Sequence, residues 1–464
     1  MRECQNRRSA AQGEKVLRRT RWGGLADGQF EASGFFRVDQ QDGIHWLVDP
    51  EGGRFLSKGV NNVRFDQDHI RNTDKIPYAE ACLAKYGSRN NWRAAAADRL
   101  AGWHVNTIGC WSDEVVAGAG RVPLAMTPIV DLGASFWLHR RGQRFPDVFD
   151  AGFEDHIQHR AKDLCTPRRN APQLLGTFID NELYWSPDWR GTDELLTTFL
   201  NFPVRRAGRV TAITALQQHY REFEQFNAVW RTPARSWEAL HMLRQIEPPF
   251  VRTPPGPLYE AEEARANGLD RRRAAFAADC EAFAAVVADR YFETCVAAIK
   301  AADPNHLVLG SRFGALPHEG VVAAAGRHLD VISFNCYAFD PSPLIDAYAV
   351  TGKPCMITEF AFRGDDVGLP NSMGGGPRVA DQIERAARFR HYARAAVSKP
   401  TLVGYHWFEH ADQPREGRFD GEDCNYGTVN IEDEVYAELT DAISEVNAAA
   451  EWLHAGWDDA PPLG

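Results

Sequence analysis

The segment Leu174–Glu182, with the sequence LLGTFIDNE, is a short apolar run that ends in three polar side chains. A second apolar run, Cys355–Glu359 (CMITE), also ends in a glutamate. Short apolar runs of this kind are typical of buried strands in a parallel sheet. Since active-site residues of α/β enzymes lie where strands end, these two glutamates are the first candidates for chemistry.

Six more apolar runs accompany these two along the chain, and amphipathic or alanine-rich stretches separate them. Alternation of strands and helices favours parallel pairing with right-handed crossovers. Eight such units predict an α/β protein, a (β/α)8 TIM barrel, with a doubly wound sheet as the alternative. The predicted strands are Phe55–Val60, Val105–Cys110, Thr127–Leu132, Leu174–Ile179, His306–Leu309, Val331–Asn335, Cys355–Thr358 and Leu402–Trp407.

The regions outside this alternation define the expected domains. Residues 1–27 are polar and predict a flexible tail, and residues 28–54 predict a short N-terminal β meander. Residues 55–464 form the predicted catalytic barrel. The distance between the fourth and fifth strands is too long for one crossover, so we expect a helical insertion at about 186–300.

Composition limits the partners. The 464 residues carry a formal net charge of −11, which disfavours nucleic acid and anionic membranes and fits a neutral ligand better. The first residues have no apolar core of the kind a secretion signal needs, and the nine cysteines are scattered. We therefore expect a cytoplasmic protein with reduced cysteines; the sequence leaves its oligomeric state open.

Two strand-end carboxyl groups match the needs of glycoside hydrolysis. One carboxyl must protonate the leaving oxygen, and the other must attack the anomeric carbon; a retaining enzyme holds them roughly 5–5.5 Å apart. Asn181, which precedes Glu182, can bond a sugar 2-hydroxyl. Tyr337 can donate to Glu359 and keep it ionised and oriented. Trp407 offers a face for a sugar ring, and Trp111, Trp137 and Trp185 could extend this platform.

These residues resemble those of the large clan of retaining (β/α)8-barrel glycoside hydrolases. Longer stretches are similar to the agarase-type family of β-galactan hydrolases, and the resemblance covers roughly residues 35–455. The stretches are Phe55–Asn61, Ile179–Leu183, Phe226–Trp230 with Ser236-Trp237, Ala302–His306, Gly368–Asn371, Tyr405–Glu409, Asp412–Pro414 and Gly421–Gly427.

The resemblance implies Glu182 as acid/base and Glu359 as nucleophile, with no cofactor. It places Asn181, Tyr337 and Trp407 in the first sugar subsite, and it implies sugar contacts near Asn61, Arg312, Glu409 and Asn425. The expected substrate is a neutral β-linked oligo- or polysaccharide, either agarose-type or a simpler β-galactoside. The residues also fit a β-glucosidase or β-mannosidase, a transglycosylase, or a barrel that binds sugars without cleaving them.

One motif points elsewhere. His406 to His410 reads H-x-x-E-H, an inverted form of a zinc-protease motif. That chemistry needs both histidines one helical turn apart, whereas this segment follows a strand pattern, so we expect no metal. By its position at a strand end, His406 remains a candidate for substrate binding.

Overall fold

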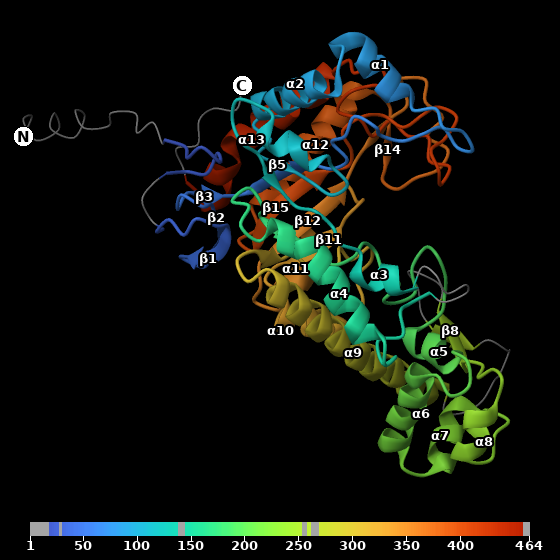
Figure 1. The fold of residues 1–464 in the computed structure, drawn as a ribbon. Coiled ribbons are helices and arrows are strands. Elements are labelled where there is room, and N and C mark those ends of the chain that lie inside the picture. Colours follow the sequence, from blue (N-terminus) through green and yellow to red (C-terminus); the bar gives the residue numbers. More distant parts are fainter. Residues whose placement is uncertain (1–17, 27–29, 138–143, 253–257, 261–268, 458–464) are drawn as a thin grey trace, which may run out of the picture.

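The computed structural model describes residues 18–26, 30–137, 144–252, 258–260 and 269–457 (Figure 1). Its centre is a parallel sheet with the strand order β11-β12-β15-β4-β5-β6. Every residue of these strands is buried, which explains why polar and apolar residues do not alternate along them. The strands are β4 (Ser57–Val60), β5 (Thr107–Ile108), β6 (Ala125–Met126), β11 (Ile332–Asn335), β12 (Cys355–Phe360) and β15 (Leu402–Trp407).

The α/β class is confirmed, but the regular sheet in the described residues has six strands, not the predicted closed ring of eight. The remaining two predicted strands, β7 (Gly176–Thr177) and β10 (Leu307–Val308), pair with each other in parallel. Isolated parallel bridges lie on both sides of this pair: Met126–Leu174, Ile129–Phe178 and Phe313–Phe334.

The third predicted strand, Thr127–Leu132, is displaced. Strand β6 covers Ala125–Met126 instead and ends before Pro128. Because proline lacks the N–H that a sheet ladder needs, regular pairing stops there, and only the bridge at Ile129 continues it.

Helices cover the sheet, and α2 and α12 begin at residues whose side chains cap them. Ser88 accepts from the N–H of Asn91 at the start of α2, and Asp381 accepts from Glu384 at the start of α12. The helices around the sheet are α1 (Pro77–Tyr86), α2 (Arg89–Gly102), α3 (Leu132–Trp137), α4 (Phe153–Cys165), α9 (Leu269–Ala302), α10 (Glu319–His328), α11 (Ser342–Ala349), α12 (Gln382–Val397) and α13 (Ala437–Ala455). Short 3-10 turns lie at Glu114–Gly118 and Thr166–Arg168, and two-residue strands β13 (Arg363–Gly364) and β14 (Arg378–Val379) pair in a loop.

A three-stranded antiparallel sheet lies at the N-terminal side: β1 (Arg37–Gln41), β2 (Ile44–Val48) and β3 (Arg54–Phe55). Of the predicted tail, residues 1–17 and 27 lie outside the described residues. Residues 18–26 are packed rather than frayed, because Leu25 bridges both Arg19 and Arg54, and Trp22 and Leu25 are buried. The division of the chain into domains stays a prediction.

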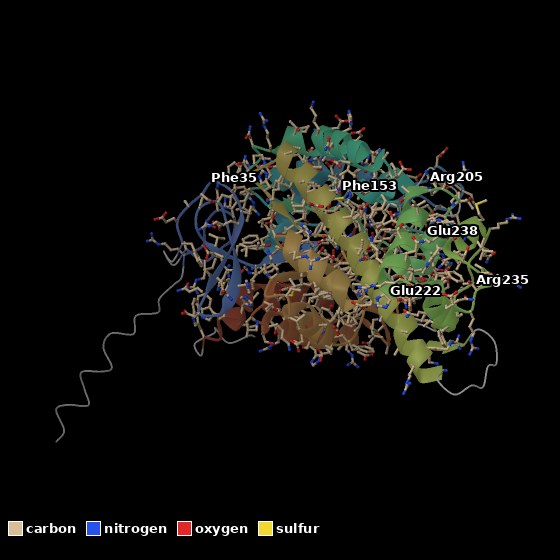
Figure 2. The ribbon with its side chains drawn as sticks, turned by 90° about the horizontal axis from the view of Figure 1, so that it is seen from below. Phe35, Phe153, Arg205, Glu222, Arg235 and Glu238 are labelled. Carbon is tan, nitrogen blue, oxygen red and sulfur yellow. The ribbon has the colours of Figure 1, made fainter. Side chains whose placement is uncertain are left out.

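Between β7 and β10 lie the elements of the predicted insertion: α5 (Leu195–Leu200), α6 (Ala207–Tyr220), α7 (Phe223–Trp230), α8 (Trp237–Met242), and the pair β8 (Phe250–Arg252) and β9 (Leu258–Glu260). They lie at the end of the molecule opposite the N-terminal sheet (Figure 1). Figure 2 shows the same separation from below, with Phe35 at one end and Glu222, Arg235 and Glu238 at the other.

Helix α9 connects the insertion to the rest of the molecule. Its 34 residues span about 50 Å, and it packs against α4 and α10 as well as α5 and α7. The buried carboxylate of Asp279 in α9 accepts hydrogen bonds from Tyr220 (2.7 Å) and Trp230 (2.8 Å) of the insertion. The insertion is therefore fastened to the same helix that reaches the sheet.

Candidate active site

The strand ends share an unusual backbone feature. The residues Asn62, Trp111, Asp131, Glu182 and Arg312, which follow β4, β5, β6, β7 and β10, all have a left-handed φ between +48° and +61°. Non-glycine residues adopt this conformation at a cost, and such residues cluster at functional sites. Five neighbouring strands end in this way, so the candidate site lies at the carboxyl ends of the parallel strands.

Glu182 is held by polar neighbours at these strand ends. Asn335 at the end of β11 donates to Glu182 Oε1 at 2.8 Å and to Asn181 Oδ1 at 3.2 Å. Burial of the carboxyl, together with the nearby charge of Glu359, raises the pKa of Glu182 to about 7. This carboxyl can therefore carry a proton near neutral pH, as a general acid requires.

Glu359, within β12, has different surroundings. The hydroxyl of Tyr337 donates to Glu359 Oε2 at 2.7 Å, and Arg312 Nη2 lies 2.9 Å from Glu359 Oε1. Arg312 is fully buried and also donates to the carbonyl of Thr358 at 3.0 Å. A carboxylate contacted at one oxygen by a cation and at the other by a phenol is held in one orientation.

The backbone just before Glu182 is fixed by the side chain of Asp180. Asp180 is fully buried and accepts from the N–H groups of Gly133 (2.7 Å) and Ala134 (2.9 Å). It also accepts a hydrogen bond from the hydroxyl of Tyr291 in α9. Asp180 thus positions the strand end that presents Glu182.

Aromatic rings lie beside Arg312 and Tyr337, the two residues that contact Glu359, and one of these rings, that of Phe408, was not predicted. The guanidinium of Arg312 lies over the Trp111 ring at 4.5 Å, and the ring of Phe408 lies 6.2 Å from that of Trp111. Phe408 is also 6.5 Å from Tyr337 and 5.2 Å from Tyr426. Phe408 therefore joins the predicted residues Trp111 and Tyr337 at the site.

Two predicted sugar platforms are instead part of the core, and these predictions are corrected. Trp185 is 3% exposed and packs against Phe292 and Phe145. Trp407 is 1% exposed, donates to the carbonyl of Tyr426 at 2.8 Å and packs against Phe360. The side chain of Trp137 lies outside the described residues.

Three predicted polar contacts are also structural, because their side chains are fully buried and bonded to protein. Asn61 donates to the carbonyls of Thr358 and Trp407 and accepts from the N–H of Cys110. These bonds tie neighbouring strand ends together and leave its amide unavailable to a sugar.

His406 and Asn425 complete this set. Ser57 lies 2.8 Å from His406 Nε2, and burial lowers the pKa of His406 to about 3, so the ring stays neutral. Asn425 accepts from the N–H of Gly364 at 3.1 Å and donates to Asp412 at 2.9 Å. The expected sugar contacts at both residues are therefore not supported by their positions.

Glu409 lies in a buried cluster of charged groups. It accepts from Asn62 and, at 3.0 Å, from Gln413, and Arg418 lies 3.8 Å away. Burial and the charge of Asp68 raise the pKa of Glu409 to about 8. Glu409 is fully buried, so any influence on a ligand passes through its neighbours.

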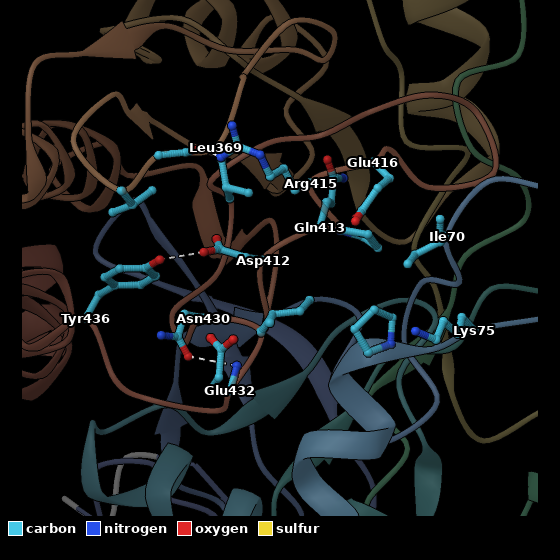
Figure 3. Close-up of a pocket in the computed structure, with 15 residues that line it drawn as sticks. Ile70, Lys75, Leu369, Asp412, Gln413, Arg415, Glu416, Asn430, Glu432 and Tyr436 are labelled. Carbon is cyan, nitrogen blue, oxygen red and sulfur yellow. Dashed lines mark hydrogen bonds between the residues drawn. The ribbon is translucent and has the colours of Figure 1, made fainter. Parts of the chain in front are cut away.

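Two cavities lie near these residues. The smaller, of about 190 Å³, is lined by Trp111 and Asp131 and so adjoins the candidate site. The larger, of about 620 Å³, is lined by loops around Asp412 and Arg415, and Tyr436 donates to Asp412 at 2.5 Å there (Figure 3). Neither glutamate is among the residues that line either cavity.

No group of three or more metal-binding side chains occurs within the described part of the chain. His410, the second histidine of the H-x-x-E-H motif, lies 3.2 Å from the hydroxyl of Tyr78, away from the Ser57 contact of His406. The eight cysteines among the described residues are buried and form no disulfide. The helices in the same residues lack the combination of length and apolarity that crossing a bilayer requires.

The chain was compared with known proteins. No protein-family model matches the sequence. The chain is 27% identical to Beta-agarase B and 28% identical to Beta-agarase A, both from Vibrio sp. (strain JT0107), over 92% and 88% of its length. It spans about half the length of these relatives, 50% and 44% respectively.

Solved structures give the same result. An agarase, AgWH50C, matches with a TM-score of 0.75 at 25% identity, covering 95% of this chain and 68% of that chain. BpGH50 matches with a TM-score of 0.72 at 25% identity, covering 95% and 87%. An exo-beta-agarase shares the fold, with a TM-score of 0.75 at 23% identity over 94% and 68%. The resemblance to agarase-like glycoside hydrolases is therefore confirmed, in sequence and in fold.

Proposed function

We propose that this chain is a retaining glycoside hydrolase that cleaves β-glycosidic bonds in β-galactosides or agarose-type oligosaccharides. The observation that carries the proposal is the contrast between two strand-end carboxyl groups. Glu182 has a pKa raised to about 7, whereas Glu359 is bonded by Arg312 and Tyr337. Different environments for two nearby acids are what an acid/base and a nucleophile need.

In the proposed mechanism a carboxylate oxygen of Glu359 attacks the anomeric carbon while Glu182 gives its proton to the departing glycosidic oxygen. The bond between that oxygen and the anomeric carbon breaks, and a covalent glycosyl-enzyme forms. Glu182 then removes a proton from water, which attacks the anomeric carbon and releases Glu359. Two inversions retain the configuration.

The fold proposed for this activity is a (β/α)8 barrel. Its support is the pairing of β7 with β10 and the bridges Met126–Leu174 and Phe313–Phe334, which link this pair to β6 and β11, the two edges of the six-stranded sheet. In such a barrel the ends of the fourth and seventh strands face one mouth, where Glu182 and Glu359 can act on one bond.

The substrate proposal is supported by the similarity to the Vibrio agarases and by the net charge of −11, which suits a neutral sugar chain. A screen of β-linked galactans, glucans and mannans with product analysis would separate the agarose-type reading from the glucosidase and mannosidase alternatives. The cytoplasmic location stays a prediction.

The decisive experiment replaces each glutamate. Glu182→Ala and Glu359→Ala should each lower kcat/KM on an unactivated substrate by at least about 10³-fold. With an aryl β-galactoside, azide should rescue Glu182→Ala and yield a β-galactosyl azide with retained configuration. Rescue of Glu359→Ala with a retained product would reverse the roles, and full activity of both variants would refute the mechanism.

A further inference from the structure

Trp189 is an exposed aromatic residue at the tip of a tight turn. Asp188 and Gly191 exchange backbone hydrogen bonds of 3.1 Å each, which close the turn and place Trp189 at its apex. The Trp189 residue is 63% exposed. A single exposed tryptophan is unremarkable by itself, so its surroundings decide whether it has a role.

The ring of Trp189 lies beside Glu182. A Cβ atom built on Gly314 would lie 2.8 Å from Trp189 Cη2 and 3.0 Å from Glu182 Cδ. The indole edge and the carboxyl group therefore approach the same point on the backbone of Gly314. Because Gly314 has no side chain, Trp189 and Glu182 can both pack against its backbone.

Arg190 holds the tryptophan in this position. Its guanidinium lies over the Trp189 ring at 4.6 Å, and its Nη1 donates to the backbone carbonyl of Glu182 at 2.6 Å. The carboxylate of Asp188 pairs with the same guanidinium. One guanidinium thus links the indole to the backbone of the proposed acid. This contact restrains the ring and lowers the conformational entropy lost when a ligand stacks on it.

The position of Trp189 beside Glu182 also indicates which of the two sugars joined by the scissile bond would contact it. A general acid stands next to the oxygen of the leaving group, so the space beside Glu182 belongs to the departing sugar. Pyranose rings present a face of C–H groups that packs on an aromatic ring, and a neutral sugar needs no charged partner there. The buried Trp185 cannot supply this surface, whereas Trp189 can.

We propose that Trp189 is the stacking platform for the leaving-group sugar and sets a preference for substrates with a sugar on that side of the bond. This inference rests on the proposed function of Glu182 as the acid. It assigns to Trp189 a role in specificity rather than in proton transfer.

The test compares a sugar leaving group with one that has no ring to stack. Trp189→Ala, Trp189→Phe and the control Trp457→Ala, an exposed tryptophan that packs against Trp452, would be assayed side by side. Two measurements are made on each: kcat/KM on agarose-derived oligosaccharides, and the rate of covalent labelling by 2-deoxy-2-fluoro-β-galactosyl fluoride, whose leaving group is fluoride.

We expect Trp189→Ala to lose about tenfold in kcat/KM on the oligosaccharides and to be labelled at the parental rate. Trp189→Phe should recover most of the loss, and Trp457→Ala should match the parent in both assays. Equal losses in both assays, or no loss in either, would overturn the proposal.

A binding measurement separates this inference from the proposed function. The oligosaccharide affinity of Glu359→Ala would be compared by calorimetry with that of the same variant carrying Trp189→Ala. If the parent neither cleaves the substrates nor reacts with the label, the proposed function fails. Stacking of a sugar on Trp189 would still stand if Trp189→Ala weakens binding about tenfold, whereas its assignment to a leaving group would fall together with the proposed function. An unchanged affinity would refute the stacking itself.

Discussion

At the scale of single residues, the surroundings of Glu182 explain how it can carry a proton at neutral pH. Burial and the charge of Glu359 act in the same direction and raise its pKa to about 7, while the Asn335 amide opposes them by stabilising the ionised form. Glu359 has its two oxygens occupied by Tyr337 and Arg312. Two chemically identical groups thus have different surroundings, as the two proposed roles require.

The pKa of Glu182 predicts the alkaline limit of activity. A general acid must be protonated, so activity is present below pH 7 and is lost as the pH rises through about 7. The measurement is kcat/KM against pH on an unactivated oligosaccharide. Glu182→Gln should lower the rate and remove this limb; a limb that persists in the variant would assign it to another group.

Asn335 should tune this limit. Its amide donates to Glu182 Oε1 at 2.8 Å and so lowers the pKa of that carboxyl. In Asn335→Ala the pKa should rise, the alkaline limb should move to higher pH, and kcat should fall because Glu182 loses an orienting bond. The exposed Asn305→Ala serves as control. A limb that moves to lower pH would contradict the assignment.

At the scale of elements, adjacent parallel strands approach closely because one of them carries glycine. Gly59 in β4 pairs with His406 in β15, and a Cβ on Gly59 would lie 2.6 Å from His406 Cγ and 2.7 Å from its Nε2. The ring is fully buried and bonded to Ser57, so it has no free space into which to move.

Gly59→Ala should therefore destabilise the protein by about 2 kcal/mol, through overpacking of these two strands. The change would be measured as the free energy of unfolding in urea. Gly102→Ala at the end of α2 is the matched control, because no heavy atom lies within 4 Å of its added Cβ. Equal stability of the two variants would show that the strands can separate at no cost.

The strands also show what sequence patterns can and cannot predict. The run Leu402–Trp407 coincides with β15, because a strand that is buried on both faces is mostly apolar and does not alternate. The direction of each side chain at the strand end is not encoded so simply. Trp407 packs into the core while Phe408, the next residue, faces Trp111 and Tyr337, since successive side chains point to opposite faces.

The same limit applies to the loops of the candidate site. The glutamates could be found because each closes an apolar run. Trp189 could not be distinguished from Trp185, because a turn closed by backbone bonds between Asp188 and Gly191 decides which ring reaches solvent. The left-handed backbone conformation of residues such as Arg312 could not be predicted either, because glycine is the residue type that normally indicates this conformation in a sequence.

At the scale of the whole molecule, a buried ion pair joins distant parts of the chain. Lys58 Nζ in β4 lies 2.6 Å from Glu451 Oε1 in α13, and Arg19 from the N-terminal segment reaches Glu451 Oε2 at 3.0 Å. Lys58 also donates to the carbonyl of Asn447 at 3.0 Å. One carboxylate therefore connects the first strand of the central sheet, the last helix and the N-terminal segment.

Removing one charge should leave the other buried without compensation. Glu451→Gln should lower the free energy of unfolding by about 3 kcal/mol, whereas the double variant Lys58→Met/Glu451→Leu should recover most of that loss. Asp346→Asn, which breaks the exposed pair with Lys399, should cost less than about 0.5 kcal/mol. Urea unfolding measures all three, and a double variant no better than the single one would contradict this account.

Helix α9 has a mechanical consequence for the molecule. Asp279 receives bonds from the insertion, and Tyr291, about 18 Å further along the same helix, grips Asp180 two residues before Glu182. A helix is stiff over such a length, so α9 couples the position of the insertion to the position of Asp180. We therefore expect a displacement of the insertion helices to reach the strand end that carries Glu182, the proposed acid.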